Sequence, residues 1–212
     1  LVIMFEDIQL EKGWGQGWTG QSGRTWGCLM SGTDLTPILN EPIPDIVKIC
    51  PIRDGKIYFP LKNGKEVVIP MQAFVGTIAT SLEIDIGTTT LGRHGGNMDV
   101  ADCCPKNKLF LPIFVDGAYL YMGDVHAAQG DGEMGGAAIE IPAEVTMKID
   151  LIKGKTINWP RIETPDYIMS VGNTRPIDDA VRVASHDLLL MLRDDYGFDL
   201  WDANILFNAV GK

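Results

Sequence analysis

Two glycine-rich segments hold two of the three histidines of the chain, together with several acidic residues. They read GRHGGNMDV, residues 92–100, and YMGDVHAAQGDGEMGG, residues 121–136. Imidazole nitrogens and carboxylate oxygens form a mixed ligand set that suits Zn²⁺ or another divalent transition ion. We therefore predict a metal site built from these segments, with His94, Asp99, Asp124 and His126 as its candidate ligands.

Alternation along the second segment places Asp124 and His126 on one face of an expected strand. The apolar residues with the same parity are Ala118, Leu120 and Met122. If that face points into the core, burial of each charged group costs on the order of several kcal/mol. A metal ion or dense hydrogen bonding must then compensate for this cost. The glycines that follow let the backbone turn and bring Asp131 and Glu133 back to the same place. A carboxylate left outside the ligand set can carry protons, and Glu133 is the first candidate, with Asp131 beside it.

Simpler explanations exist for each of these short strings. Asp131 precedes a glycine and is typical of a turn, and His94 is compatible with a loop histidine satisfied by backbone carbonyls. His186 lies in the middle of an expected helix and indicates a surface or core position. The pair Cys103 and Cys104 has no basic partner or helix N-terminus nearby that would lower a thiol pKa, so a structural role is favoured.

Short apolar runs separated by 24 glycines and 12 prolines predict β-strands at 57–61, 66–69, 74–79, 109–114, 118–122 and 144–151. Glycines at positions 55, 64 and 117 end the turns between such runs. Residues 13–44 are rich in small residues and carry Trp14, Trp18 and Trp26, which predicts an ordered loop packed on the sheet. Its tryptophans would cover an edge of the core or line a substrate pocket.

Two helices are expected near the C-terminus. The first begins after Thr174-Arg175-Pro176 and stops at Gly197, and its predicted buried stripe is Ile177, Ala180, Val181, Ala184, Leu188, Met191 and Leu192. The second begins near Leu200 with Asp199 as its cap, and its predicted buried stripe is Trp201, Ile205, Leu206 and Val210. We predict a mainly β fold, with a β-sandwich or jelly-roll-like core and a small α+β C-terminal part that carries two helices. Residues 1–160 would form the β-rich catalytic core and residues 161–212 the helical part packed on it.

Composition excludes several kinds of partner. A formal net charge of −10 leaves no basic stripe for nucleic acid. No apolar run approaches the roughly 20 residues that span a bilayer, so no membrane association is expected. Four cysteines without zinc-finger spacing favour a reducing cytoplasm. The chain opens directly on an apolar strand, which predicts a missing pairing segment.

Longer strings in the chain resemble the acetamidase/formamidase family. They are GRHGGNMD at 92–99, LFLPIFVDGAYLYMGDVHAAQGDGE at 109–133, the following IPAEVTMKIDL, and the closing DDAVRVASHDLLLMLRDDYGFDLWDANIL. The resemblance implies hydrolysis of formamide, acetamide or other short aliphatic amides to ammonia and a carboxylic acid, with a divalent metal cofactor for which we expect Zn²⁺. It also implies that the chain lacks segments at both ends.

The resemblance extends to the motif residues His94, Asn97, Asp99, Asp124, His126 and Glu133. We expect Asn97 to orient the substrate, and Gly95 and Gly96 to let the backbone approach it closely. Two alternatives stay open: a β-sandwich that binds a metal or ligand without catalysis, and a hydrolase of cyclic amides (lactams) on the same scaffold. A truncated strand edge and helices with apolar stripes favour a homodimer or higher homo-oligomer.

Overall fold

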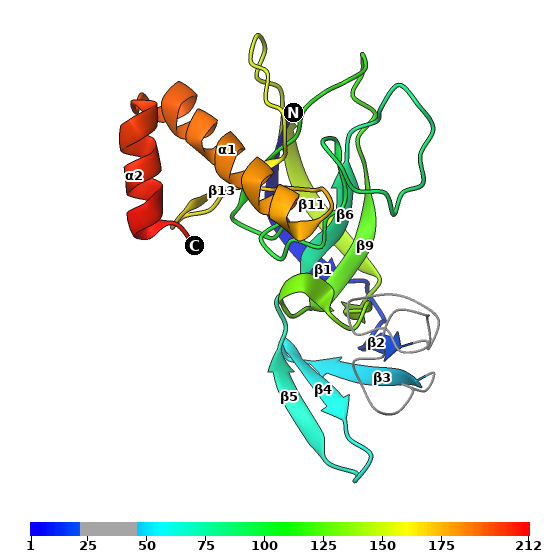
Figure 1. Ribbon diagram of the computed structural model, residues 1–212. Coiled ribbons are helices and arrows are strands. Elements are labelled where there is room, and N and C mark those ends of the chain that lie inside the picture. Colours follow the sequence, from blue (N-terminus) through cyan, green and yellow to red (C-terminus); the bar gives the residue numbers. More distant parts are fainter. Residues whose placement is uncertain (22–45) are drawn as a thin grey trace.

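The computed structural model describes residues 1–21 and 46–212, which form two antiparallel sheets and two C-terminal helices (Figure 1). The strands are β1 Val2–Leu10, β2 Gln16–Gln21, β3 Ile46–Arg53, β4 Lys56–Pro60, β5 Glu66–Pro70, β6 Phe74–Ala79, β7 Gly95–Asn97, β8 Lys108–Phe110, β9 Tyr121–Ala128, β10 Ile139–Glu140, β11 Ala143–Asp150, β12 Arg161–Glu163 and β13 Ile168–Ser170. The helices are α1 Ile177–Tyr196 and α2 Leu200–Val210, and Asp131–Glu133 form one turn of 3₁₀ helix. The predicted mainly β class with two C-terminal helices is confirmed.

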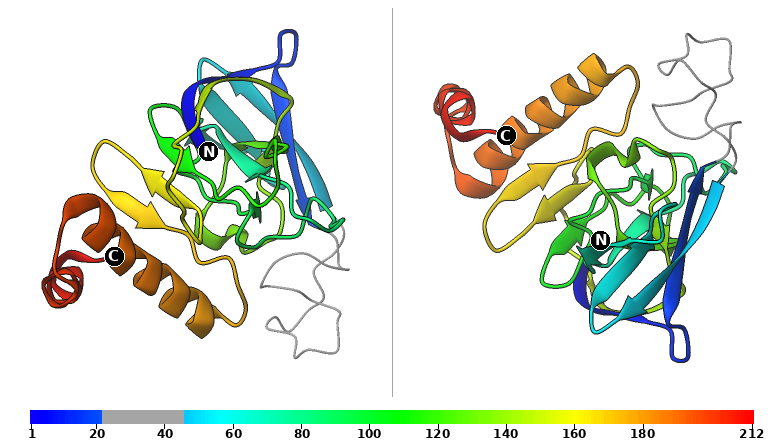
Figure 2. Two further views of the ribbon diagram at one scale, coloured as in Figure 1. Left: turned by 90° about the horizontal axis from the view of Figure 1, so that it is seen from above. Right: turned by 90° about the horizontal axis from the view of Figure 1, so that it is seen from below.

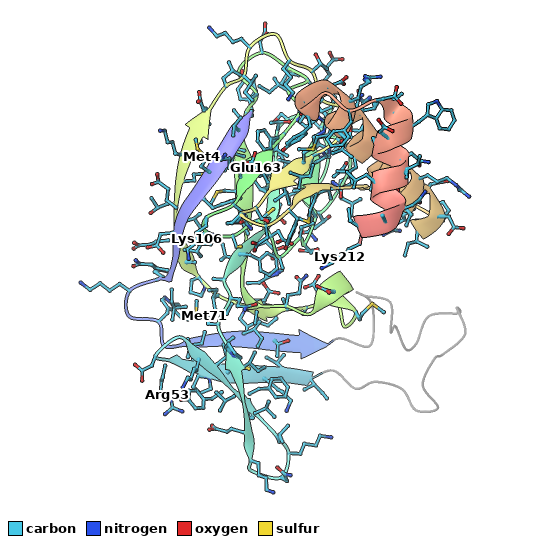
Figure 3. All side chains as sticks on the ribbon, turned by 90° about the vertical axis from the view of Figure 1, so that its left-hand side faces the viewer. Met4, Arg53, Met71, Lys106, Glu163 and Lys212 are labelled. Carbon is cyan, nitrogen blue, oxygen red and sulfur yellow. The ribbon has the colours of Figure 1, made fainter. Side chains whose placement is uncertain are left out.

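The two sheets enclose one apolar core. The five-stranded sheet has the order β11-β1-β8-β12-β13, and the eight-stranded sheet has the order β5-β4-β3-β2-β10-β9-β6-β7. Ile3 and Leu109 from the first sheet and Val75 and Ile78 from the second are fully buried in this core. Each such side chain contributes about 1.5–3 kcal/mol relative to an exposed one. Strands β2 to β5 extend as an arm, and Figure 3 shows Arg53 on it and Met71 where it meets the rest of the molecule.

Most predicted strands are confirmed to within one or two residues. The strand expected at 118–122 instead begins at Tyr121 and continues to Ala128, because Ala118 and Tyr119 have left-handed φ angles of 57° and 46°. The strand expected at 109–114 is shorter, at Lys108–Phe110, since Pro112 has no N–H to continue a ladder.

The loop predicted for residues 13–44 is wrong in its first part. Gln16–Gln21 form strand β2, which pairs along its whole length with β3. Trp14 and Trp18 are about half exposed, at 51% and 47%, so they do not seal an edge of the core. Trp26 lies outside the described residues.

The helix boundaries are confirmed. Gly197 ends α1 with φ 73°, and the side chain of Asp199 accepts a hydrogen bond from the Trp201 backbone N–H at the start of α2. Pro176 itself occupies the N-cap position of α1, and no side chain caps that end. Within the described residues, no helix is long and apolar enough to cross a bilayer.

The predicted buried stripes are only partly correct. Met191 is buried in α1, but Ile177 and Val181 are exposed. In α2 only Ala203 is buried, whereas the predicted stripe residues, led by Trp201 at 76%, are exposed. Figure 2 shows the reason: α2 packs against α1 on the side away from the sheets, so its apolar side chains do not reach the core.

A buried ion pair attaches α1 to the five-stranded sheet. Arg161 donates from Nε to Asp187 Oδ2 at 2.8 Å and from Nη2 to Oδ1 at 3.0 Å, and Ser170 donates to the same carboxylate at 2.9 Å. Arg161 lies on β12, which pairs with β8. Strands from both predicted parts, residues 1–160 and 161–212, therefore belong to one sheet.

The exchange Asp187→Ala is expected to lower the free energy of unfolding by about 3–5 kcal/mol, because it leaves the buried guanidinium with only the longer carboxylate contact of 3.4 Å to Asp195. Urea unfolding measures this loss. The matched control is Asp179→Ala, which breaks the exposed pair with Arg182 and is expected to cost no more than about 1 kcal/mol. Equal losses in the two variants would contradict the role given to the buried pair.

Candidate metal and active site

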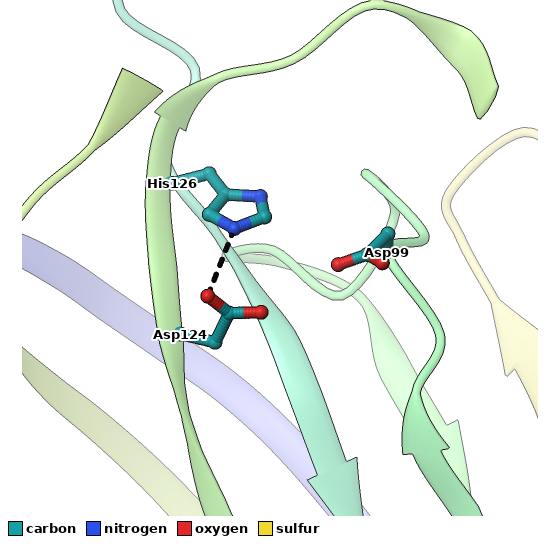
Figure 4. A group of neighbouring side chains, drawn as sticks. All are labelled: Asp99, Asp124 and His126. Carbon is teal, nitrogen blue, oxygen red and sulfur yellow. Dashed lines mark ion pairs between the residues drawn. The ribbon is translucent and has the colours of Figure 1, made fainter. Parts of the chain in front are cut away.

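Three neighbouring strands bring the two glycine-rich segments together. Strand β6 lies between β7 and β9, and its Thr77 is opposite Asn97 on one side and Gly123 on the other. All six residues of β6 are buried, so the strands beside it are held in a fixed register. Asp99, Asp124 and His126 therefore lie next to one another although they come from separate segments (Figure 4).

Five side chains form what we call the carboxylate–imidazole cluster: Asp99, Asp124, His126, Glu133 and Glu140. The His126 Nε2 atom lies 3.3 Å from Asp124 Oδ1 and 3.2 Å from Glu140 Oε2. Potential metal-ligand atoms lie within 4.8 Å of one another in two groups that share His126, the first with Asp99 and Asp124, the second with Glu133 and Glu140.

The predicted shared face of Asp124 and His126 is confirmed by this contact. The face is not a core face along the whole strand, however, since Met122 and Asp124 are partly exposed while His126 is buried. Asp124 also has a left-handed φ of 59°. The strand thus carries the imidazole into the protein and leaves the Asp124 carboxylate at the boundary with solvent.

The electrostatics of the cluster favour a cation. Burial and, after it, the nearby charge of Glu133 raise the pKa of Asp99 to about 7. Burial would lower the pKa of His126, but the hydrogen bonds with Asp124 and Glu140 outweigh it and raise that pKa to about 10. Burial also raises the pKa of Glu133. Four carboxyl groups thus face a single imidazolium, and the excess negative charge in a partly buried site requires compensation.

One oxygen of the cluster has no partner. Asp99 Oδ1 is buried, and within residues 1–21 and 46–212 no group donates a hydrogen bond to it. A buried carboxylate oxygen without a donor costs about 1–3 kcal/mol or more, unless a cation binds it. The donor set of carboxylate oxygens and one imidazole nitrogen fits a divalent ion bound by Asp99, Asp124 and His126.

A glycine inside β6 makes room for the two aspartates. A Cβ atom at Gly76 would lie 2.9 Å from both Asp124 Oδ2 and Asp99 Oδ1, which is closer than such atoms approach. The glycine interrupts the apolar run FVGTIA, and this interruption was an available sequence signal for a close approach that the sequence analysis did not use.

The variant Gly76→Ala is expected to bind Zn²⁺ at least about tenfold more weakly, because the added methyl group displaces two of the three candidate ligands. Competition with a chromophoric chelator measures the affinity. Gly123→Ala on the adjacent strand is the matched control, since a Cβ there would meet nothing within 4 Å. Unchanged affinity in Gly76→Ala would show that these carboxylates do not bind the ion.

Neighbouring polar side chains hold the carboxylates in place. The Thr77 hydroxyl contacts Asn97 Oδ1 and lies 3.2 Å from Asp124 Oδ2. Asn97 Nδ2 donates to Asp99 Oδ2 at 2.9 Å. The Asn97 amide, predicted to orient the substrate, thus contacts Asp99 and Thr77 in this structure.

His94 is not brought into the cluster. Its backbone oxygen accepts a hydrogen bond from Thr80 N–H, whereas Asp99 N–H donates to the backbone oxygen of Gly76. Gly76 and Thr80 are four residues apart on an extended stretch of chain, so their backbone positions are roughly 13 Å apart. The imidazole is 1% exposed, its burial lowers its pKa, and neither ring nitrogen has a hydrogen-bond partner within the described residues. The backbone carbonyl of Thr90 nevertheless acts on the ring and opposes this lowering of its pKa, so the alternative of a loop histidine that faces a backbone carbonyl stays open.

The two glycines beside His94, which we predict to let the backbone approach the substrate, lie close to other backbone atoms of the protein. Gly95 and Gly96 have φ angles of 101° and 106°, and a Cβ at either would lie within 2.5 Å or 2.1 Å of a backbone oxygen. They allow backbone to pack on backbone within β7 and its neighbours. Asp131 is exposed at the first position of the 3₁₀ turn and joins neither group of ligand atoms.

The chain therefore offers a test of which histidine binds metal. His94 belongs to neither group of ligand atoms, so His94→Leu is expected to leave Zn²⁺ affinity within about twofold of the wild type, whereas His126→Leu is expected to lower it at least about 100-fold. Calorimetric titration with Zn²⁺ measures both. Loss of binding in His94→Leu with retained folding would return His94 to the ligand set.

An open groove of about 1120 Å³ borders the cluster. Gln129, Asp131 and Glu133 line it, together with apolar side chains that include Met71 and Phe74. A smaller cavity of about 550 Å³, between β8 and α1, contains no member of the cluster. The groove is therefore where a ligand would reach the cluster.

Two site residues were absent from the sequence analysis. Glu140 interrupts the apolar run AAIEIP, which was a weak signal for a carboxylate near the core. Gln129 had no signal beyond its position three residues after His126, and only the folded chain shows that its Oε1 lies 2.9 Å from His126 Nδ1.

Comparisons with known proteins show which family this chain resembles. A family model described as the Acetamidase/Formamidase family matches residues 63–181. The chain is similar to a formamidase from Methylophilus methylotrophus, with 31% identity over 129 residues that cover 60% of this chain and 31% of that protein. It is similar to the crystal structure of an acetamidase from Yersinia enterocolitica, with 39% identity, a TM-score of 0.90, and coverage of 100% of this chain and 62% of that one. A γ-lactamase from Delftia acidovorans shares the fold at 21% identity and a TM-score of 0.64, with 95% and 64% covered. The chain thus spans less than two thirds of the length of each of these proteins.

Proposed function

Because this chain belongs to the acetamidase/formamidase family, we propose that it hydrolyses formamide, acetamide or another short linear amide to ammonia and the carboxylic acid. The single observation that best supports this proposal is the carboxylate–imidazole cluster, with its excess of carboxyl groups, at the side of an open groove. Such a cluster supplies both ligands for an ion and a carboxyl group that can transfer protons.

We propose that Asp99, Asp124 and His126 hold a divalent ion, with Zn²⁺ as the expected one, and that Glu140 lies close enough to complete the set. The unpartnered Asp99 Oδ1 supports this assignment. When bound, the ion would act as a Lewis acid that lowers the pKa of water from about 15.7 to about 7.

Glu133 is the proposed proton carrier. It lines the groove, and its carboxylate lies near His126 and Glu140 without belonging to the first group of ligand atoms. Burial raises its pKa, which makes the carboxylate a better base. It would accept the proton of the attacking water and donate it to the amide nitrogen, so that nitrogen leaves as ammonia.

Ammonia release from the zinc-loaded chain tests the proposed function. Formamide, acetamide and a small lactam are assayed side by side, and release from the linear amides is the expected result. Hydrolysis of the lactam alone would transfer the activity to cyclic amides. No hydrolysis by a folded chain that binds zinc would favour a metal-binding protein without catalysis.

Self-association and a cytoplasmic location stay predictions. Exposed apolar side chains on α1 and α2, among them Ile177 and Trp201, favour self-association. Light scattering from the purified chain measures it directly, and a mass equal to one chain at all concentrations would contradict it.

A further inference from the structure

The side chain of Gln129 connects two of the proposed ligands. Its Oε1 lies 2.9 Å from Nδ1 of His126, and its Nε2 donates to the backbone oxygen of Asp99 at 2.9 Å. Gln129 is half-buried just after β9, in the wall of the groove. One amide group thus contacts the strand that carries His126 and the turn that carries Asp99.

The contact with Asp99 determines which way the amide points. A backbone carbonyl oxygen only accepts hydrogen bonds, so the NH₂ end of Gln129 must face it. The reversed amide would set two acceptor oxygens against each other. The Gln129 oxygen therefore faces His126 Nδ1, and this nitrogen must carry a proton to make the contact a hydrogen bond.

We propose that Gln129 is a positioning residue that keeps the proton of the neutral His126 ring on Nδ1 and so presents Nε2 to the ion. A neutral imidazole has one proton to place, and the nitrogen without it is the one that can bind a metal. Nε2 is the atom that faces Asp124 and Glu140. The inference rests on the proposed metal-dependent function.

The same amide restrains a second ligand. Asp99 has a left-handed φ of 51°, which is uncommon for a residue with a side chain, and its carbonyl is held by Gln129. Loss of Gln129 would therefore release both the ring of His126 and the backbone of Asp99. Partners of this kind typically change metal affinity by about 10–100-fold.

The test compares Gln129→Met, which keeps the length of the side chain but removes both hydrogen bonds, with Gln129→Glu, which keeps an acceptor for Nδ1–H. Zn²⁺ affinity is expected to fall about 10–100-fold in Gln129→Met, while Gln129→Glu stays closer to the wild type than to Gln129→Met. The exposed Gln9 provides the matched control, because Gln9→Met makes the same chemical change far from the cluster. Thermal unfolding of the metal-free variants shows that each is folded.

Nitrogen-15 NMR gives a readout that a purely structural role would not move. The chain has three histidines, so the imidazole spectrum of the zinc-loaded protein is simple to assign with His94 and His186 variants. The wild type is expected to show a protected Nδ1–H proton and a zinc-bound Nε2 for His126. In Gln129→Met this proton is expected to exchange rapidly with water.

The outcomes separate this inference from the function on which it rests. A wild-type chain that binds no zinc overturns both. A wild type that binds zinc, with unchanged affinity in Gln129→Met or with Nδ1 as the bound nitrogen, overturns the role of Gln129 alone. Reduced affinity together with loss of the protected Nδ1–H supports it.

Discussion

Removal of divalent ions is expected to abolish amide hydrolysis by this chain, and addition of Zn²⁺ is expected to restore it. The physical reason is the barrier to making hydroxide at neutral pH. A drop in the pKa of water from about 15.7 to about 7 corresponds to roughly 12 kcal/mol, and no side chain of the cluster supplies an equivalent effect alone. Ammonia release after exhaustive chelation, dialysis and metal return is the measurement.

The same experiment has a structural readout. Without an ion, the carboxyl groups of the cluster repel one another and Asp99 Oδ1 lacks a partner. An ion bound only by the folded chain, at about 1,000 times its dissociation constant, stabilises that state by about 4 kcal/mol. For a chain of this size, the midpoint of thermal unfolding would rise by roughly 8–16 °C.

The two readouts are interpreted together. Full hydrolysis in a chain shown to be metal-free would refute the metal step while leaving the amidase proposal standing. A midpoint that does not respond to Zn²⁺ would show that Asp99, Asp124 and His126 do not bind the ion in this chain. Mg²⁺ at equal concentration controls for ionic strength, since it prefers a set of oxygen ligands and retains its waters.

The substitution Glu133→Gln is expected to lower kcat by about 10²–10⁴-fold with little change in Zn²⁺ affinity. Glutamine has the size of glutamate but cannot accept a proton from water or return one to the leaving nitrogen. Glu133 lies in the group with Glu140 rather than among the three proposed ligands, so metal binding should persist. Steady-state ammonia release with formamide, together with metal titration, measures both quantities.

A neighbouring acid provides the control for this substitution. Asp131→Asn changes the charge of the groove in the same way, but Asp131 is exposed and joins neither group of ligand atoms. The sequence analysis named Asp131 beside Glu133, and a larger loss in Asp131→Asn would exchange their roles. Wild-type kcat in Glu133→Gln would leave Glu140 as the remaining carboxyl group near His126 to be tested.

Local sequence patterns were sufficient to predict most elements of the fold. A short apolar run predicted the fully buried strand β6, and alternating apolar residues predicted β11, because a strand places successive side chains on opposite faces. Gly197 and Asp199 specified the helix ends, because a left-handed C-cap and a side-chain N-cap depend on one or two residues. Asp124 and His126 were paired correctly, since their contact depends only on a spacing of two along one strand.

Long-range packing decided the rest. The burial of α2 was wrong because an apolar stripe does not say whether a sheet is available to cover it. His94 looked like a ligand in sequence, but the register of β7 against β6 places it at the opposite end of the strand from Asp99. Glu140, Gln129 and the space above Gly76 belong to the site only because β10, β9 and β6 lie side by side in one sheet.

The sequence by itself therefore determined the family, the mainly β class and the chemical types of the site residues, because each of these depends on residues that are close together in the chain. The tertiary structure decided which carboxylates share the imidazole of His126, which histidine stands apart and which side chain holds the ring. These depend on strand register and on distances between segments far apart in the chain, and no local pattern of residues specifies such distances.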